Sequence, residues 1–420
     1  MPDCQGGGLA PVDPQGRNTR KGAIREQVLG DNVVDLAIVG GGLVGLSVAA
    51  ALRGSGLSVV LMDRAPPPAL LPPQLPDWDV RVFAISPGSE AFLRGCGTWP
   101  DAIQRIQPVD AMQIYGDSRT GYLRFDARDA RTVHLASIVE NRLLLHGLWS
   151  VVRDDPDVRV CAPARAIDVD FETDSARLLL ESGESVRARL LVAADGANSW
   201  LRAHAGIFAS ASSYRQSAIV ANFECERPHG GTAFQWFRND GVLALLPLPG
   251  RRCSMVWSAD ESLAVELMQL PSDLLAARVE TASQRQLGSL TSIGPAAGFP
   301  LQLVRVPRLV QPRLALVGDA AHNLHPLAGQ GVNLGFQDAR DLVTVLRERR
   351  ACPDVGQYQL LRRYERMRRE DVLTMTLATD GLHRLFDIES RPLSWLRNSG
   401  LSVLNRVGPI KRLLVRHALG

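Results

Sequence analysis

Three glycine-containing turns follow apolar segments of the chain, and two of them include a carboxylate. The first is Gly40-Gly41-Gly42-Leu43-Val44-Gly45, the second is Asp195-Gly196, and the third is Gly318-Asp319. Backbone N–H groups of a glycine turn can bind phosphate oxygens, and a carboxylate can accept hydrogen bonds from the hydroxyl groups of a sugar or polyol. Residues of these types in this order suit the binding of a phosphorylated nucleotide.

The first turn has the G-x-G-x-x-G spacing of a dinucleotide site. Gly40 allows a tight turn, Gly42 lets a pyrophosphate approach the backbone, and Gly45 lets the following helix pack closely on the preceding strand. The pyrophosphate would meet free N–H groups and the positive end of the helix dipole. Asp63 follows about 20 residues later, where such sites carry the carboxylate that binds a ribose hydroxyl. The alternative is a plain glycine-rich turn, but this context favours nucleotide binding.

A fourth pattern is His325-Pro-Leu-Ala-Gly-Gln-Gly-Val-Asn333, which continues to Asp338. It predicts a proline-rigidified loop that leads into a helix opened by glycines. Free N–H groups and the helix dipole at such a helix start stabilise negative charge on a ring placed above them. A reduced flavin carries such charge at its pyrimidine end. His322 and His325 flank this loop, and we interpret both as structural hydrogen-bonding residues.

The elements around these motifs indicate where the motifs lie in the fold. Residues 35–39 and 58–62 are apolar strands with a helix between them, which is a β-α-β unit and implies a parallel sheet. Antiparallel strands are clearest within 212–257, and a strand at 313–317 leads into a helix over 329–349. The order predicts an α/β protein in which a nucleotide domain is assembled from separated segments and an antiparallel-sheet domain is inserted. The predicted units are a flexible tail (1–32), the nucleotide domain (33–108, 132–210 and 298–348), a substrate domain (109–131 and 211–297) and a helical C-terminal region (349–420).

Apolar spacing predicts further helices, at 137–152, 272–286, 357–386 and 395–417. In the third of these, Glu365 and Glu370 alternate with arginines, so we predict a salt-bridged surface there. The arginines are Arg362, Arg363, Arg366, Arg368 and Arg369.

Composition excludes several classes of protein. The 420 residues are 45% hydrophobic with a net charge of +3, which suits a globular chain and is too small a charge to indicate nucleic-acid binding. The six cysteines are scattered, so neither a disulfide framework nor a metal site is predicted. The apolar run 36–52 is broken by glycines and is short for a bilayer span of about 20 residues. The polar N-terminal segment lacks the apolar region of a secretory signal.

Together the four motifs resemble those of the class A flavoprotein monooxygenases, the group that includes para-hydroxybenzoate hydroxylase. The fourth pattern is similar, letter for letter, to the signature of the ubiquinone-biosynthesis hydroxylases within that group. The likeness runs from about residue 33 to the C-terminus and includes Asp79-x-Arg81-x-x-Ala-Ile-Ser86, Val139-Glu-Asn141 and Ala244-x-Leu-Pro247-Leu. It implies a Rossmann-like FAD-binding domain and an inserted sheet that binds an aromatic substrate.

The resemblance also implies where FAD is contacted. Gly40, Gly42 and Gly45 correspond to the pyrophosphate-binding glycines, with Asp63 and Arg64 at the adenosine ribose. The remaining implied contacts are Arg81 to FAD, Asp195 and Gly196 near FAD and the nicotinamide route, Gly318 and Asp319 at the ribityl chain, and Pro326, Leu327, Gly329, Gln330, Gly331 and Asn333 around the isoalloxazine ring. We assign no catalytic residue and no metal ligand.

The chemistry implied by the resemblance is hydroxylation of an aromatic ring, with NAD(P)H and O2 as co-substrates. NAD(P)H reduces FAD, and a flavin C4a-hydroperoxide then donates oxygen to an electron-rich phenol, while the protein positions the ring and excludes water. The implied substrate is a lipophilic, polyprenylated phenol or quinol of ubiquinone biosynthesis. The alternatives are a hydroxylase of a small soluble phenol and a non-catalytic FAD-binding scaffold subunit of a quinone-synthesis complex.

A polyprenyl substrate requires access to a bilayer or a carrier. Six basic residues and no acidic ones lie within 391–416 among apolar residues, which fits either a surface for anionic lipid or a solvated helix packed on the body. We expect a cytoplasmic protein, peripheral on the inner membrane, or alternatively one on the matrix side of a mitochondrion. Other proteins of ubiquinone synthesis are candidate partners.

Overall fold

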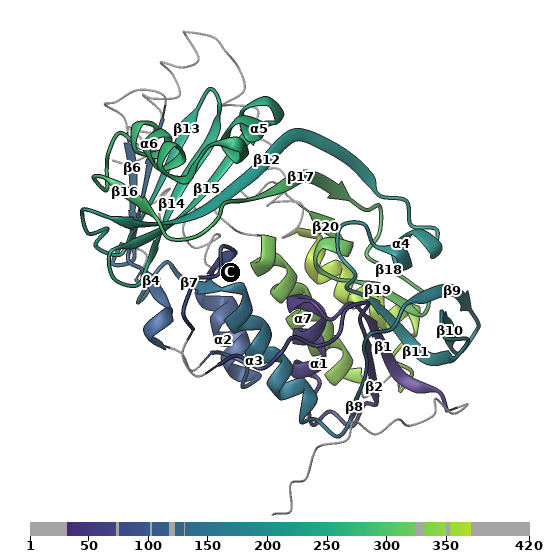
Figure 1. Cartoon of the computed structure of the whole chain (residues 1–420). Coiled ribbons are helices and arrows are strands. Elements are labelled where there is room, and N and C mark those ends of the chain that lie inside the picture. The colour runs from purple at the N-terminus through teal and green to yellow at the C-terminus, as the bar shows by residue number, and fades with distance from the viewer. Residues whose placement is uncertain are drawn as a thin grey trace, which may run out of the picture.

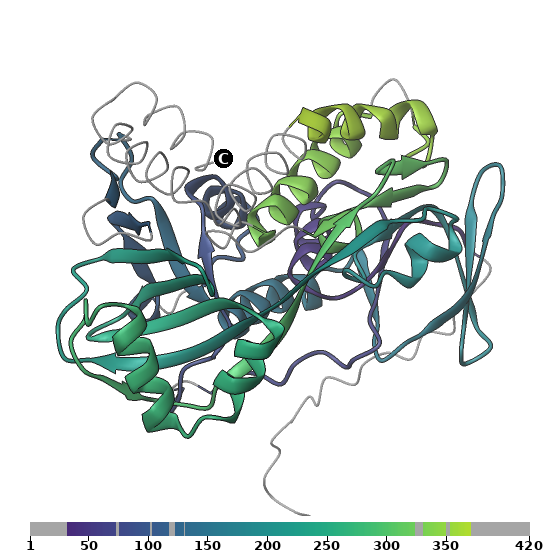
Figure 2. The same cartoon turned by 90° about the horizontal axis from the view of Figure 1, so that it is seen from above.

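The computed structural model describes residues 32–72, 75–100, 103–116, 122–129, 131–323, 331–349 and 353–370. Two large β-sheets form two halves of the molecule, and the long strands β12 (Ser210–Cys225) and β17 (Ala297–Arg305) run from one half toward the other (Figure 1). The two halves also lie side by side when the molecule is seen from above (Figure 2).

An eight-stranded sheet forms the first half. Its strands are β1 (Val34–Val39), β2 (Val59–Met62), β8 (Val158–Cys161), β9 (Ala166–Phe171), β10 (Ala176–Leu180), β11 (Ser185–Ala193), β18 (Val310–Gln311) and β19 (Leu314–Leu316). The order is β18-β19-β11-β1-β2-β8, and β10 and β9 continue from β11. The central pairs, β2-β8, β1-β2, β1-β11 and β11-β19, are parallel. The predicted α/β fold is confirmed, and so is its assembly from segments far apart in the chain.

Three helices pack on this sheet: α1 (Leu43–Ala51), α3 (Asn141–Arg153) and α7 (Gly331–Arg347). Helix α1 contacts both α3 and α7. Leu36, Ile38 and Leu190 in the central strands are fully buried, which is why these strands read as continuous apolar runs rather than as alternating patterns. The run 36–52 thus divides into a strand, a glycine turn and a helix, as predicted. In the part of the chain that the structure describes, we find no helix with the length and apolar character that a membrane span needs.

A nine-stranded, mainly antiparallel sheet forms the second half. Besides β12 and β17 its strands are β5 (Ala111–Tyr115), β6 (Tyr122–Asp126), β13 (Thr232–Arg238), β14 (Gly241–Leu248), β15 (Arg252–Asp260), β16 (Leu290–Ser292) and β20 (His322–Asn323). The order is β20-β17-β12-β15-β14-β13-β5-β6, with β16 beside β12. The sheet extends through β17 to Arg305, beyond residue 298, where we expected the chain to return to the nucleotide domain.

Helices α5 (Glu261–Gln269) and α6 (Ser272–Ala282) cover one face of the second sheet. Phe223, Met255 and Trp257 are buried beneath these helices, in a core separate from that of the first half. Because side chains alternate along a strand, the residues between them lie on the opposite face of the sheet. Helix α5 was not predicted, whereas α6 lies within the predicted segment 272–286.

A small sheet with the order β3-β7-β4 joins the two halves. It is made of β3 (Val82–Ile85), β4 (Gln107–Val109) and β7 (Ala136–Glu140). Strand β7 corrects the predicted helix over 137–152, because its residues pair with β3 and β4 and the helix begins only at Asn141. The apolar residues Ile138 and Val139 serve a buried strand, and apolar spacing alone does not distinguish a short buried strand from a helix. The remaining elements are α2 (Pro87–Gly95), α4 (Trp200–His204), the short turns η1 (Ile103–Arg105) and η2 (Gly318–Ala320), and a helix over 358–370.

Candidate functional site

The glycine turn between β1 and α1 is tightly packed on its protein side and open on the other. Gly40 has φ of +116°, and a Cβ there would lie 2.2 Å from the carbonyl oxygen of Ala194. A Cβ on Gly45 would lie 2.0 Å from the carbonyl oxygen of Gly40, whereas one on Gly42 would meet nothing within 4 Å. Gly42 is the N-cap of α1, and no side chain caps the helix there. The turn therefore presents uncapped N–H groups beside open space, as a bound pyrophosphate requires.

Asp63 follows β2 and braces this turn. One carboxylate oxygen accepts a hydrogen bond from the N–H of Gly41 at 2.6 Å, and the other accepts one from the N–H of Ala65 at 2.7 Å. Each oxygen keeps a second lone pair, so the carboxylate can still accept a hydrogen bond from a ribose hydroxyl. Arg64 is exposed next to it.

The Asp195-Gly196 turn follows β11 and packs against the glycine turn, because the Cβ position of Gly40 lies within 2.8 Å of the backbone nitrogen of Asp195. The Asp195 carboxylate accepts hydrogen bonds from the hydroxyl of Ser199 and from the N–H of Leu201, the latter at 3.1 Å. It therefore orders the start of α4, and the side chain is engaged within its own turn. Gly196 has φ of +85°, a conformation that favours glycine.

Asp319 and Arg81 bring two unpaired charges to the same region. Among the described residues, neither the Asp319 carboxylate nor the Arg81 guanidinium makes a hydrogen bond or an ion pair. Asp319 is accessible to water yet closely surrounded by protein, so desolvation raises its pKa, while the charges of His322 and Arg81 act in the opposite direction. The guanidinium of Arg81 lies 5.4 Å from the ring centre of Phe83 and 5.6 Å from that of Phe299. A free carboxylate suits the hydroxyls of a ribityl chain, and a free guanidinium suits phosphate or flavin oxygens.

A buried network holds the turn that carries Asp319. One oxygen of Asp338 accepts hydrogen bonds from the N–H of Gly318 at 2.8 Å and from His322 Nε2 at 2.7 Å, and the other accepts one from Arg368 at 2.7 Å. Burial opposes ionisation of Asp338, but the charges of His322 and Arg368 and these hydrogen bonds outweigh it and lower its pKa. His322 is thus structural, as predicted.

The prediction that Arg368 lies on the protein surface is wrong. Its side chain is fully buried, not part of a salt-bridged surface, because the helix over 358–370 turns Tyr364 and Arg368 toward α7 and β19. The hydroxyl of Tyr364 donates to the carbonyl oxygen of Leu316 at 2.8 Å, and Arg368 also pairs with Asp341 at 3.2 Å. The i, i+4 spacing of Tyr364 and Arg368 on one helix face is the signal that could have revealed this role.

Only the end of the fourth pattern lies in the described part of the chain. Gly331 begins α7, and both ends of the Asn333 amide bind backbone: the oxygen accepts from the N–H of Ser86 at 2.9 Å, and the nitrogen donates to the carbonyl of Ala84 at 2.8 Å. Asn333 therefore ties α7 to the junction of β3 and α2. The predicted contacts outside the described residues are Pro326, Leu327, Gly329 and Gln330.

The second sheet offers an apolar face beside Arg81, on the side away from α5 and α6. One row across the paired strands places small residues between two phenylalanines, and a second row lies parallel to it. Val242, Ala244 and Val256 on this face are half-buried. Its buried members are Ala218, Val220, Gln235, Phe237 and Ser258. The first row is Phe299, Ala218, Ser258, Val242 and Phe237, and the second is Ala297, Val220, Val256, Ala244 and Gln235. We call these two rows the substrate face.

These features fit FAD: uncapped N–H groups for a pyrophosphate, carboxylates for hydroxyl groups, and a guanidinium beside an apolar face. The chain matches the family described as FAD binding domain over residues 33–378. It shares its fold with p-nitrophenol 4-monooxygenase PnpA of Pseudomonas putida, with a TM-score of 0.73, 17% identity, and coverage of 92% of this chain and 98% of that one. Klebsiella pneumoniae HpxO, solved with FAD and uric acid, gives a TM-score of 0.71 and 19% identity, and the match covers 92% and 97% of the two chains. The fold is that of the class A flavin monooxygenases.

Two relatives narrow the class further. Ubiquinone hydroxylase UbiL of Rhodospirillum rubrum is 39% identical over 395 residues, covering 93% of this chain and 90% of the relative. The 3-demethoxyubiquinol 3-hydroxylase of Escherichia coli is 36% identical over 389 residues, covering 92% and 98%. The chain belongs to the ubiquinone-biosynthesis hydroxylase family of FAD-dependent monooxygenases.

Proposed function

We propose that this enzyme hydroxylates the aromatic ring of a polyprenylated phenol or quinol in ubiquinone biosynthesis, with NAD(P)H and O2 as co-substrates. The observation that carries the proposal is the substrate face, where small residues lie between Phe299 and Phe237. Phe299 also contacts Arg81, so the face adjoins the residues that suit FAD. The named activities of the two relatives support this substrate class.

Each part of the site has its own task in this reaction. The N–H groups at Gly42 and the dipole of α1 bind the pyrophosphate, and Asp319 accepts hydrogen bonds from the ribityl chain. Arg81, beside Phe299 of the substrate face, would contact the flavin. FAD, when bound, supplies the hydride acceptor and the activation of oxygen. The apolar side chains of the substrate face keep water from the reacting ring, which limits loss of the activated oxygen as hydrogen peroxide.

The second row of the substrate face bears on the size of the substrate. Val256 and Ala244 are half-buried and extend the apolar surface beyond the first row, next to the buried Val220. A small soluble phenol would use only the first row, whereas a prenylated ring would bury surface on both, with a gain of about 25 cal/mol per Å². This extra apolar area favours the prenylated substrate over a small phenol.

The test is turnover by the purified FAD-loaded enzyme, with NADH and NADPH in separate assays. Short-chain prenylated phenols and small hydroxybenzoates are compared, and the product is identified by mass spectrometry. We expect substrate-stimulated NAD(P)H oxidation and one added ring oxygen with the prenylated phenols. Turnover of hydroxybenzoates alone would favour the small-phenol hydroxylase, and bound FAD with no hydroxylated product would favour the scaffold function.

We also infer that the enzyme meets its substrate at a membrane surface, as a peripheral protein of the cytoplasmic or matrix side. The support is the excess of basic residues in 391–416, which lies outside the described residues. Cosedimentation with phosphatidylglycerol vesicles at low salt is the expected result, with release when salt shortens the screening length to about 3 Å at 1 M. Equal binding to neutral phosphatidylcholine vesicles would contradict the electrostatic attraction.

A further inference from the structure

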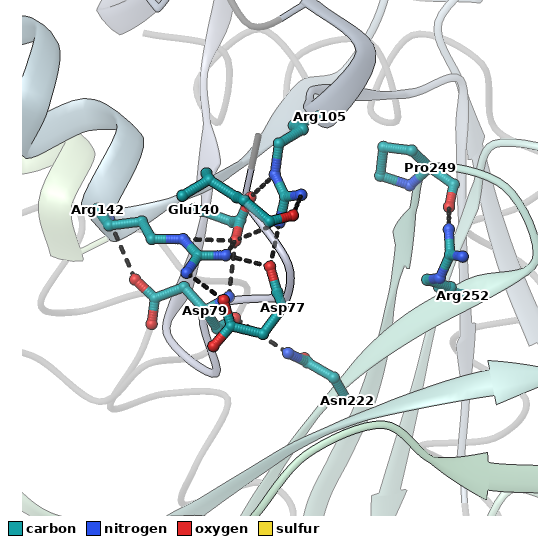
Figure 3. A network of polar contacts seen from close by, with 9 residues as sticks. Asp77, Asp79, Arg105, Glu140, Arg142, Asn222, Pro249 and Arg252 are labelled. Carbon is teal, nitrogen blue, oxygen red and sulfur yellow. Dashed lines mark hydrogen bonds and ion pairs between the residues drawn. The ribbon is translucent and has the colours of Figure 1, made fainter. Parts of the chain in front are cut away.

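A buried glutamate organises the segment that carries Arg81. Glu140 is fully buried at the end of β7, and its carboxylate accepts hydrogen bonds from two arginines (Figure 3). Arg105 binds it with two nitrogens, at 2.6 and 3.0 Å, and Arg142 with two more, at 3.1 and 2.8 Å. The same carboxylate accepts the backbone N–H of Asp79 at 2.6 Å. A buried carboxylate with this many donors is a rigid anchor for residue 79.

Asp79 in turn holds the backbone of Arg81 in place. Its carboxylate accepts the backbone N–H of Arg81 at 3.0 Å and that of Arg142 at 3.0 Å. The carbonyl oxygen of Arg81 accepts the N–H of Asn141 at 2.9 Å. The backbone of the segment is therefore held on both sides, while the guanidinium of Arg81 extends from it toward Phe83 and Phe299.

One hydrogen bond to this segment comes from the second sheet. Asn222, in β12, is 3% exposed, and its amide nitrogen donates to the carbonyl oxygen of Asp79 at 3.0 Å (Figure 3). The amide oxygen of Asn222 is also buried, but it has no hydrogen-bond partner among the described residues. The same is true of the hydroxyl of Ser254, which is opposite Asn222 on the paired strand β15. An unpaired buried acceptor destabilises the fold unless another group donates a hydrogen bond to it.

Asn222 lies on the same side of the sheet as the substrate face. Val220 and Ala218 precede it at intervals of two along β12, and both belong to the two rows of that face. One end of the Asn222 amide thus binds the Arg81 segment, and the other end, which is buried and has no hydrogen-bond partner among the described residues, lies at the margin of the substrate face. A hydrogen bond accepted at an amide oxygen polarises the amide and strengthens the bond that its nitrogen donates.

We propose that Asn222 is a positioning residue that couples occupancy of the substrate face to the position of Arg81. A ring hydroxyl of the substrate donates to the amide oxygen of Asn222, directly or through one water, and this strengthens the Asn222–Asp79 bond and fixes Arg81 against the flavin. The inference rests on the proposed function, from which it takes the hydroxylated ring as the ligand.

The first test compares Asn222→Leu, which has similar size and no polar atoms, with Thr98→Val as the matched control. The Thr98 hydroxyl is buried and donates to the backbone carbonyl of Leu93 at 3.0 Å, so the control removes a bond of the same kind away from the site. We expect similar losses of stability in the two variants. Substrate stimulation of NAD(P)H oxidation should fall about tenfold only in Asn222→Leu, through kcat more than KM, with a larger share of hydrogen peroxide. Unchanged stimulation in Asn222→Leu would overturn the proposal.

A double-mutant cycle with Arg81→Lys tests whether the effect passes through Arg81. If it does, the double variant should lose little more stimulation than Arg81→Lys alone, whereas fully additive losses would contradict the coupling. The fluorescence of bound FAD should also change in Asn222→Leu and not in Thr98→Val, even before substrate is added. This readout separates the two proposals: if the natural enzyme hydroxylates no phenol, the proposed function fails, while an unchanged flavin signal refutes the role of Asn222 by itself.

Discussion

Replacing Arg368 with methionine removes the cation from the buried network beneath Asp319 while keeping an unbranched apolar side chain in place of the arginine stem. Arg368 and Asp338 are both fully buried, and the bond between them is 2.7 Å long. Removing one partner of such a pair leaves an uncompensated buried charge, so we expect a loss of about 3–5 kcal/mol in the free energy of unfolding. The loss is measured by urea unfolding with FAD in excess.

Arg363→Met is the matched control on the same helix. Arg363 pairs with Glu348 at 2.8 Å, but both side chains are more than a third exposed, so the expected cost is below about 1 kcal/mol. Equal costs for the two methionine variants would refute the buried network as the reason for the role of Arg368.

The pH dependence of this difference follows from Asp338. Its pKa in the folded protein is lowered, so its stabilising effect is fully present above the unfolded pKa and is lost as the pH falls through the folded value. Without Arg368 the pKa is lowered less. The stability gap between the natural enzyme and Arg368→Met should therefore be full at neutral pH and narrow in acid. A gap that widens in acid would contradict this sign.

Three further predictions test the site and its surroundings. Gly40→Ala should prevent correct folding, because its Cβ would lie 2.2 Å from the carbonyl oxygen of Ala194. Gly42→Ala should fold normally but lose FAD affinity, because its Cβ would meet nothing within 4 Å. Measurements of soluble yield and FAD titration distinguish the two variants. Desolvation raises the pKa of Asp319, so Asp319→Asn should raise the unfolding temperature of the apoprotein. The same substitution should weaken FAD binding about tenfold or more. Calorimetry of the apoprotein and of FAD binding would show whether the two effects have opposite signs. Burial raises the pKa of the Cys96 thiol to about 11, so this thiol should be alkylated about a hundredfold more slowly than a free thiol at pH 8. The rate, followed by peptide mass spectrometry, should approach that of a free thiol only in urea.

The sequence by itself determined the parts of the protein whose contacts are local. The glycine turn, the strand before it and the helix after it follow from a few consecutive residues, because the close approach of Gly45 to Gly40 spans only one turn of chain. The position of Asp63 beside the glycine turn could be predicted for the same reason, since a β-α-β unit returns the chain to the adjacent strand after a nearly constant length. The fold class and the cofactor followed from these units and their order.

Tertiary structure decided the residues whose partners lie far away in the chain. In the sequence, Arg368 looks like one of several surface arginines. Packing of its helix on α7 brings it to Asp338 and Asp341, which precede it by 30 and 27 residues in the chain. Asn222 reads as a polar position in a strand, and its partner Asp79 is 143 residues away. The spacing of residues along the chain does not predict such pairs. A hydrogen bond in the core depends on how whole elements pack, and this packing involves every residue of both elements.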